Sequence, residues 1–175
     1  MTDDLQSRLG ASLRAIPDYP KPGILFQDIT PVLADAHLFP AVIDALAAPY
    51  EGSGISHVLG IEARGFILGG AVAVKLGAGF VPARKPGKLP WKALRETYAL
   101  EYGTDALDMH EDALPEGARA LIVDDVLATG GTAAAAVALV RRAGAGLAGC
   151  SFLLEIGVLD GRKRLPEGVR ALLAV

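Results

Sequence analysis

The sequence has 175 residues, the size of one domain with a substantial core, and 51% of them are hydrophobic, which argues against a disordered chain. Its 17 basic and 20 acidic residues give a formal net charge of −3, which argues against a general nucleic-acid-binding protein. The single cysteine, Cys150, excludes an intrachain disulfide and suits a reducing cytoplasm. The composition therefore predicts one soluble domain over residues 1–175.

The sequence shows no targeting or membrane segment. Its N-terminus, MTDDLQSRLG, is acidic and lacks the apolar stretch of a secretion signal. No window approaches the roughly 18 to 20 continuous apolar residues that cross a membrane. We therefore expect a cytoplasmic protein with no membrane partner and no nucleic-acid partner.

The first 35 residues contain a helical pattern, a proline-rich passage and an aromatic segment. Apolar residues recur on one face of a helix predicted over residues 3–16: Leu5, Leu9, Leu13 and Ile16. The prolines and the glycine of residues 17–23 prevent a helix there and favour an ordered loop. In the segment PGILFQDI that follows, the glycine permits a sharp bend, after which Phe26 could stack on a flat ring. The alternative is that Phe26 belongs to the core.

From residue 37 onwards the sequence predicts alternating helices and strands. The helices are expected at residues 37–48, 65–76 and 132–143. The strands are expected at residues 57–61, 79–83, 118–123, 148–156 and 170–175. This alternation predicts an α/β fold with a central parallel sheet flanked by helices. In such sheets, ligands bind beyond the carboxyl ends of the strands.

The strand at 118–123 leads into the most informative stretch of the chain. Two carboxylates, Asp124 and Asp125, follow the strand, and a small flexible loop then opens a helix. The loop residues are Ala128, Thr129, Gly130, Gly131 and Thr132. Glycines let the backbone approach an anion closely, a helix start offers free N–H groups, and threonine hydroxyls add donors. The carboxylates can accept hydrogen bonds from sugar hydroxyls, so the stretch fits a ribose 5-phosphate.

This interpretation carries a geometric condition and has an alternative. Adjacent side chains of a strand point to opposite faces, so Asp124 and Asp125 can both serve only if the strand twists out at Asp125. The alternative is an Asp-rich turn with a Gly-rich helix start and no ligand, an arrangement that many α/β proteins contain.

Two other places suggest binding of a polyphosphate. The strand at 57–61 ends next to Arg64 and Gly65, which combine a guanidinium fork with backbone donors at a strand-to-helix turn. The alternative is an arginine that only covers the sheet edge. Residues 84–95 contain five basic residues and no acid, and we take Arg84, Lys85 and Lys88 as candidate pyrophosphate ligands.

The basic segment also predicts a mobile element. Its prolines and glycine are expected to preclude a stable fold of its own, and loops longer than about 12 to 15 residues are commonly lids. A positively charged lid over residues 84–105 could close on a pyrophosphate and exclude water. The alternative is a basic segment that is simply solvated.

Several other signals are weak. The sequence GAGLAG at 144–149 matches a dinucleotide motif letter for letter, but it follows a helix and precedes a strand, so we expect a helix-ending turn. The spacing of His37, His57 and His110 makes no metal site, and we expect all three to be structural. Cys150 lies in an apolar run and is expected to be buried.

Four motifs together resemble a known family. VDDVLATGGT resembles the phosphoribosyl-pyrophosphate (PRPP) binding motif of the type I phosphoribosyltransferases. GIEARGF and RKPGKLPWKALRETYALEYG resemble the pyrophosphate loop and the flexible catalytic loop of adenine phosphoribosyltransferases, and PGILFQDI resembles their base-binding segment. The resemblance runs from about residue 16 to about residue 164. It implies the type I phosphoribosyltransferase fold with a small N-terminal hood over residues 1–35.

The resemblance also implies a reaction, in which adenine and PRPP give AMP and pyrophosphate. It implies that Asp124, Asp125 and residues 128–132 hold the ribose and its 5-phosphate. It places Arg64, Gly65 and the basic lid residues on pyrophosphate, and it implies a cis peptide between Glu62 and Ala63. Adenine would be bound by Leu25, Phe26 and Gln27.

The resemblance further implies catalytic residues, a cofactor and an assembly. Glu101 matches the family's acidic position and is a candidate for proton transfer to the purine, with Arg64 beside the leaving group and Tyr98 shielding the closed site. Mg²⁺ would be held mainly by substrate and water, with few or no direct protein ligands. The protein would be a homodimer.

Three rival interpretations stay open. The first is a phosphoribosyltransferase for xanthine, another oxopurine or a pyrimidine, although PGILFQDI and RKPGKLP favour adenine. The second is a non-catalytic PRPP or purine sensor, and the third is a scaffold with a vestigial site. An assay with separate bases distinguishes them.

Overall fold

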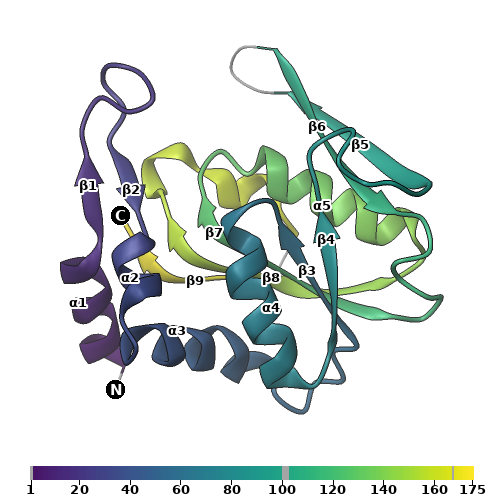
Figure 1. Ribbon diagram of the computed structural model, residues 1–175, viewed down its shortest axis with the longest axis horizontal. Helices are drawn as coiled ribbons and strands as arrows, with labels where there is room; N and C mark the ends of the chain where they lie inside the picture. The colour runs from purple at the N-terminus through teal and green to yellow at the C-terminus, as the bar shows by residue number, and fades with distance from the viewer. Residues whose placement is uncertain (1, 100–102, 167) are drawn as a thin grey trace.

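The computed structural model describes residues 2–99, 103–166 and 168–175. At its centre lies a five-stranded sheet in the order β4-β3-β7-β8-β9 (Figure 1). Every neighbouring pair in this sheet is parallel. The strands are β3 (His57–Ile61), β4 (Gly79–Ala83), β7 (Arg119–Leu127), β8 (Gly146–Glu155) and β9 (Val169–Ala174). The predicted parallel α/β sheet is confirmed.

Helices cover both faces of the sheet. The side chains of α1 (Thr2–Ser12), α2 (Thr30–Ala34), α3 (Leu38–Ala47) and α4 (Arg64–Leu76) pack in one apolar cluster, and those of α5 (Gly131–Arg142) pack in another. Helix α4 ends at its predicted bound, residue 76, and Gly77 follows in the left-handed conformation (φ 65°), which glycine adopts without strain. Short 3-10 turns follow α3 and β8: η1 (Ala48–Tyr50), η2 (Gly157–Leu159) and η3 (Gly161–Arg164).

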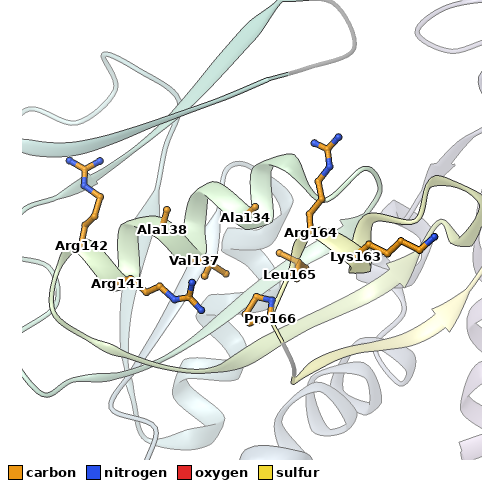
Figure 2. A pocket seen from close by; sticks show the side chains of 9 residues that line it. All are labelled: Ala134, Val137, Ala138, Arg141, Arg142, Lys163, Arg164, Leu165 and Pro166. Carbon is orange, nitrogen blue, oxygen red and sulfur yellow. The ribbon is translucent and has the colours of Figure 1, made fainter.

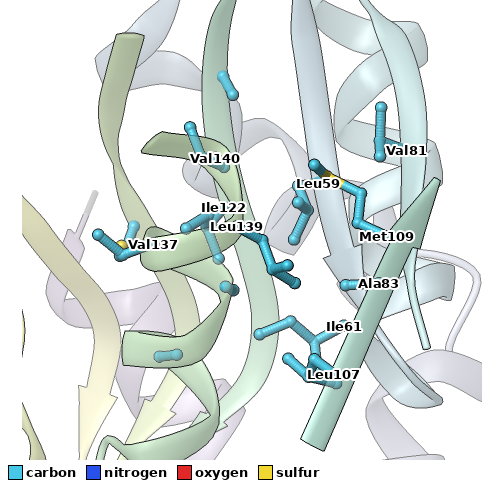
Figure 3. Close-up of a cluster of buried hydrophobic side chains, with 14 of the residues drawn as sticks. Leu59, Ile61, Val81, Ala83, Leu107, Met109, Ile122, Val137, Leu139 and Val140 are labelled. Carbon is cyan, nitrogen blue, oxygen red and sulfur yellow. The ribbon is translucent and has the colours of Figure 1, made fainter. Parts of the chain in front are cut away.

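The apolar cluster on the α5 face supports the edge of the sheet at which β3 and β7 end. Figure 3 shows Leu139 of α5 against Ile122 of β7 and Leu59 of β3, with Leu107 and Met109 closing the other side. All five side chains are fully buried. Each large apolar side chain buried in this way contributes about 1.5–3 kcal/mol. Packing in this cluster therefore holds the carboxyl ends of β3 and β7 in place.

Leu107 and Met109 belong to a hairpin that the sequence analysis did not predict. Strands β5 (Ala93–Ala99) and β6 (Thr104–His110) pair antiparallel, with Tyr98 opposite Asp105. The prediction that the basic segment, residues 84–95, has no stable fold of its own is therefore wrong for residues 93–95, which belong to β5. The side chains of β5 alternate strictly between exposed and half-buried, but charged residues occupy both faces and hide the period of two. Glu101, the predicted proton-transfer residue, lies outside the described residues.

A second two-stranded ribbon stands at the N-terminal side. Strand β1 (Arg14–Ile16) pairs antiparallel with β2 (Phe26–Asp28), so the first helix ends at Ser12 and not at residue 16 as predicted. Pairing with β2 outweighs the helical periodicity that reaches Ile16. Figure 1 shows both ribbons extending upward, β1–β2 on the left and β5–β6 on the right. In the described part of the chain, no helix is long and apolar enough to cross a membrane.

Candidate functional site

The loop between β7 and α5 encloses a small cavity. Its volume is about 80 Å³, and it is lined by Asp124 and by the residues from 126 to 133, which include the whole predicted phosphate loop. Gly130 adopts φ 79°, a left-handed conformation that permits the turn into α5. The backbone N–H groups at the start of α5 therefore border an open space, as an anion site requires.

Strand β7 runs four residues beyond its predicted end, and its side-chain alternation breaks near the carboxylates. Leu121 and Val123 pack in the cluster of α3 and α4, whereas Leu127 packs in the cluster of α5. In an unbroken strand all three would share a face. The strand therefore rotates between Val123 and Leu127, which meets the geometric condition for the two acids.

Both carboxylates consequently lie near the start of α4. A Cβ added to Gly65 would lie 2.6 Å from Asp124 Oδ1, so a larger residue there would collide with the acid. Asp125 accepts a hydrogen bond from Arg64 Nε. Asp124 lines the cavity, while Asp125, 6% exposed, points to the arginine. The pair thus joins the phosphate loop to the pyrophosphate loop.

The two acids differ in their surroundings. Burial, together with the neighbouring charge of Asp125, raises the pKa of the Asp124 carboxyl well above its usual value. The backbone N–H of Asp125 donates to Asp124 Oδ1 at 2.9 Å, and this hydrogen bond only partly offsets the effect. A ligand whose hydroxyl groups donate hydrogen bonds to Asp124 would stabilise its ionised carboxylate.

Arg64 also reaches the predicted base-binding segment. Its guanidinium lies 5.4 Å from the centre of the Phe26 ring, and Tyr19 meets the same ring edge-on at 5.2 Å and 73°. A cation over an aromatic face is attracted by the ring quadrupole. Phe26 therefore lies beside the carboxylate pair and not in the apolar core. Its neighbour Leu25 is 55% exposed, and Gln27 pairs through the backbone with β1.

Three predicted pyrophosphate ligands gather around one acid, Glu62. Its carboxylate accepts hydrogen bonds from Arg84 Nε at 3.2 Å, from the backbone N–H of Lys85 at 3.0 Å and from Lys88 Nζ. Burial acts to raise the pKa of the Glu62 carboxyl, but the hydrogen bonds from these basic residues hold it below its usual value. The peptide between Glu62 and Ala63 is cis, as predicted.

A chain of hydrogen bonds links the hairpin to the phosphate loop. Lys85 Nζ donates to the Tyr98 hydroxyl at 2.8 Å and forms an ion pair with Asp105. Thr132 Oγ1 donates to the Tyr98 oxygen at 3.2 Å, and Tyr98 donates in turn to Asp105 at 3.1 Å. Burial acts to lower the pKa of the Lys85 ammonium, but its hydrogen bonds to Asp105 and Tyr98 raise it overall. Tyr98 therefore contacts the predicted phosphate loop. That it shields the closed site stays a prediction.

Sequence reasoning missed the acids that hold the cations. The resemblance implies only a peptide geometry for Glu62, and no pattern in the sequence indicates Asp105 or Asp108. Asp108 is 3% exposed and accepts hydrogen bonds from Arg95 at 2.7 and 2.8 Å. A prediction of the hairpin from the sequence would have indicated the positions of Asp105 and Asp108, because Tyr98 lies opposite Asp105 and Arg95 lies opposite Asp108.

A larger cavity of about 490 Å³ lies beside α5 but does not form a convergent anion site. Four basic residues line it: Arg141, Arg142, Lys163 and Arg164. Figure 2 shows that their side chains point in different directions, with only Arg141 directed toward Leu165 and Pro166. Arg142 is already paired with Glu96. The predicted phosphate loop at the sheet edge therefore remains the candidate site.

Comparison with known proteins agrees with this geometry. Residues 33–166 match the family described as the phosphoribosyl transferase domain. The adenine phosphoribosyltransferase of Myxococcus xanthus is 58% identical over 161 residues, which cover 92% of this chain and 88% of that protein. That of Thermobifida fusca is 56% identical, and the match covers 100% of both chains.

Solved structures agree as well. The crystal structure of adenine phosphoribosyltransferase from Rhodothermus marinus superposes with a TM-score of 0.95 at 52% identity, covering 99% of both chains. The enzyme from Saccharomyces cerevisiae, crystallised with adenine and an imino-altritol bisphosphate, gives 0.93 at 40% identity, covering 98% of this chain and 99% of that one. The family resemblance and the predicted fold class are confirmed: the chain belongs to the adenine phosphoribosyltransferase family of the phosphoribosyl transferases.

Proposed function

We propose that this protein transfers the 5-phosphoribosyl group of PRPP to adenine, giving AMP and pyrophosphate. The observation that carries the proposal is the meeting of Phe26, Arg64 and Asp125 next to the phosphate-loop cavity. A base site, a sugar site and a phosphate site are thereby contiguous. The relative from Saccharomyces cerevisiae, crystallised with adenine, supports adenine as the base.

The ribose and its phosphate occupy the edge at β7. Ala128, Thr129, Gly130, Gly131 and Thr132 bind the 5-phosphate through N–H and hydroxyl groups. Asp124 and Asp125 accept hydrogen bonds from the ribose hydroxyls. Ring nitrogen N9 of adenine attacks the anomeric carbon as the bond to pyrophosphate breaks, and positive charge develops on the ribose near these acids. Positioning and electrostatics supply most of the rate enhancement in such a reaction.

Adenine binds against the aromatic ring of the N-terminal hood, residues 1–35. Phe26 stacks on the purine, while Leu25 and Gln27 contact it largely through backbone groups. The ring of Phe26 is already oriented between Tyr19 and Arg64. Glu101 accepts a proton from the purine ring or donates one to it.

Pyrophosphate is bound by the basic residues above β3 and β4. Arg64 and Gly65 contact it from the start of α4, and Arg84, Lys85 and Lys88 contact it from the lid, residues 84–105. Glu62 and Asp105 hold the three lid cations in place. The pyrophosphate oxygens replace these carboxylates as partners when the lid closes, so the cations are ordered before the substrate arrives.

Mg²⁺ fits the donors at this edge. Within residues 2–99, 103–166 and 168–175, no cluster of three His, Cys, Asp or Glu side chains could hold a metal ion. Mg²⁺ would therefore take most of its ligands from substrate and water, with few or no direct protein ligands, beside the ribose that Asp124 and Asp125 would hold. Such an ion would neutralise charge on the pyrophosphate.

The working assembly is a cytoplasmic homodimer of single-domain subunits. Helix α4 and the neighbouring edge strand β4 expose three large apolar side chains, with Ile67 47%, Val74 83% and Phe80 38% exposed. Exposed apolar patches of this kind mark protein–protein contacts. The patch adjoins the start of α4, so a partner there would lie close to the pyrophosphate residues.

A base-specificity assay tests the proposal. The protein is incubated with Mg²⁺, PRPP and one base at a time (adenine, hypoxanthine, guanine, xanthine or orotate), and nucleotide and pyrophosphate are measured. We expect equal amounts of AMP and pyrophosphate with adenine as the preferred base. Preference for another base overturns the substrate, and PRPP binding without product from any base indicates a sensor.

An inactive variant completes the assay. Asp125→Asn removes the charge at the ribose while leaving the shape, and it is expected to abolish most turnover. Val158→Ala is the control, because Val158 is 89% exposed and lies outside the site. Product formed equally by both variants would show that the activity arises elsewhere.

A further inference from the structure

The 3-10 turn η3 is in close backbone contact with the phosphate loop. A Cβ added to Gly161 would lie 2.1 Å from the carbonyl oxygen of Ala128 and 2.8 Å from the backbone nitrogen of Gly130. A Cβ added to Gly130 would lie 2.3 Å from the carbonyl oxygen of Gly161. Side-chain atoms do not approach backbone this closely, so the contact requires glycine on both sides.

The contact is specific to residue 161. The other glycine of the segment, Gly157, has only the carbonyl oxygen of Val175 near its added Cβ, at an ordinary 3.8 Å. The backbone of Gly161 lies outside the left-handed region, so only space, and not conformation, restricts this position. The close approach fixes two of the residues that bind the phosphate.

The same turn places the guanidinium of Arg164 beside the phosphate loop. Arg164 Nη1 lies 3.7 Å from an added Cβ on Gly131, the first residue of α5. Figure 2 shows the Arg164 side chain directed past the beginning of α5, away from Arg141. The loop itself, residues 128–132, has no charged side chain.

Among the residues that the structure describes, Arg164 has no acidic partner, unlike its two basic neighbours. Arg162 is paired with Glu155, and Lys163 with Asp160. Within the part of the chain that the structure describes, Arg164 makes no hydrogen bond or ion pair. Its charge is therefore available to an anion at the start of α5.

We propose that the turn Gly161–Arg164 is a second wall of the phosphate site. Gly161 is a positioning residue that sets the backbone of Ala128 and Gly130, and Arg164 supplies positive charge to the phosphate group of the ligand. The proposal rests on the proposed function, because the anion is the 5-phosphate of PRPP or AMP. A guanidinium beside a dianion strengthens binding without contacting the sugar or the base.

Calorimetric binding of AMP and of adenosine tests the proposal, because the ratio of the two Kd values isolates the phosphate. Gly161→Ala and Arg164→Gln are each expected to weaken AMP binding about 10-fold and to leave adenosine binding unchanged. Arg164→Lys should recover part of the loss. Gly157→Ala and Lys163→Gln are the matched controls and should bind AMP as the wild type does.

Each outcome is decisive. An unchanged AMP Kd in R164Q overturns the role of the charge, and equal losses of AMP and adenosine in G161A overturn the positioning role. Arg164 is exposed, so R164Q keeps the fold and remains informative even where G161A does not fold. If the wild-type protein itself binds AMP no better than adenosine, the proposed function fails, which is a distinct result.

Discussion

The carboxyl group of Asp124 is held where its ionised form is destabilised. Burial and the charge of Asp125 raise its pKa above the ordinary value of 3.8. The folded protein therefore binds this proton more tightly than the unfolded chain does. The resulting stabilisation is complete below the ordinary pKa and is lost as the pH rises through the raised value.

Replacement of this acid should therefore separate stability from activity. At pH 7.5 we expect Asp124→Asn to raise the unfolding temperature by about 2–4 °C, which corresponds to ~1 kcal/mol in a domain of this size, and to lower turnover sharply. Near pH 4 the difference in unfolding temperature should shrink. Thermal unfolding at both pH values measures this, and a less stable variant at both would contradict the raised pKa.

Phe26 is the second residue with a separable effect. Removal of a stacking ring weakens binding of a base by about 10-fold or more, so we expect Phe26→Ala to raise the Kd for adenine by that factor. The Kd for ribose 5-phosphate should not change, because the phosphate loop is separate. Titration of each ligand checks this, with Leu159→Ala as a surface control. Equal weakening of both ligands would show that the variant is simply misfolded.

At the residue scale, the sequence predicts site residues that lie close to one another in the chain. The Gly/Thr loop and the paired aspartates follow a strand directly. The structure places the loop and Asp124 around one cavity and directs Asp125 to Arg64. Glu62 could not be predicted as the anchor for Arg84 and Lys88, because these partners lie more than 20 residues away in the chain. Such pairings depend on tertiary contacts that no local pattern records.

Among the elements, the β5–β6 hairpin has the most direct link to the proposed phosphate site. Its Tyr98 hydroxyl connects Lys85, Asp105 and Thr132, so it joins the basic segment to the phosphate loop. We expect Tyr98→Phe to lower kcat/KM and to speed amide exchange in β5 by about 2- to 10-fold, the range for loss of one hydrogen bond. Mass-spectrometric hydrogen exchange measures the hairpin and a coupled assay measures activity.

The control for this variant is another aromatic residue of the same segment. Trp91 is 63% exposed, so Trp91→Phe should leave both measurements as in the wild type. Unchanged exchange in Y98F would mean that the hydroxyl network does not hold the hairpin to the phosphate loop.

The elements of the central sheet were predictable and the two ribbons were not. Strands β3 and β4 have their predicted bounds, because each is a short apolar run, and β3 is buried from Val58 to Ile61. Strands β1 and β5 carry polar residues on a half-exposed surface and are stabilised by partners that follow a loop. Their short alternating patterns resemble those of loops and helix ends.

At the scale of the whole molecule, the exposed face of α4 tests the assembly. If the proposed homodimer forms through this face, Val74→Asp should convert it to monomers, because the substitution places a charge in an apolar interface. Sedimentation velocity measures the mass, and Val158→Asp is the matched control, since Val158 is similarly exposed (89% against 83%) but lies on η2. A V74D protein with the wild-type mass would exclude this face as the interface.

The central claim is that the backbone amides at the start of α5 bind a sugar phosphate. The most direct measurement is a titration of the ¹⁵N-labelled protein with ribose 5-phosphate, with ribose as the control, followed by amide chemical shifts. We predict that ribose 5-phosphate moves the amide signals of residues 128–132 most strongly and that ribose leaves them in place. Large shifts elsewhere with none in this loop would contradict the claim.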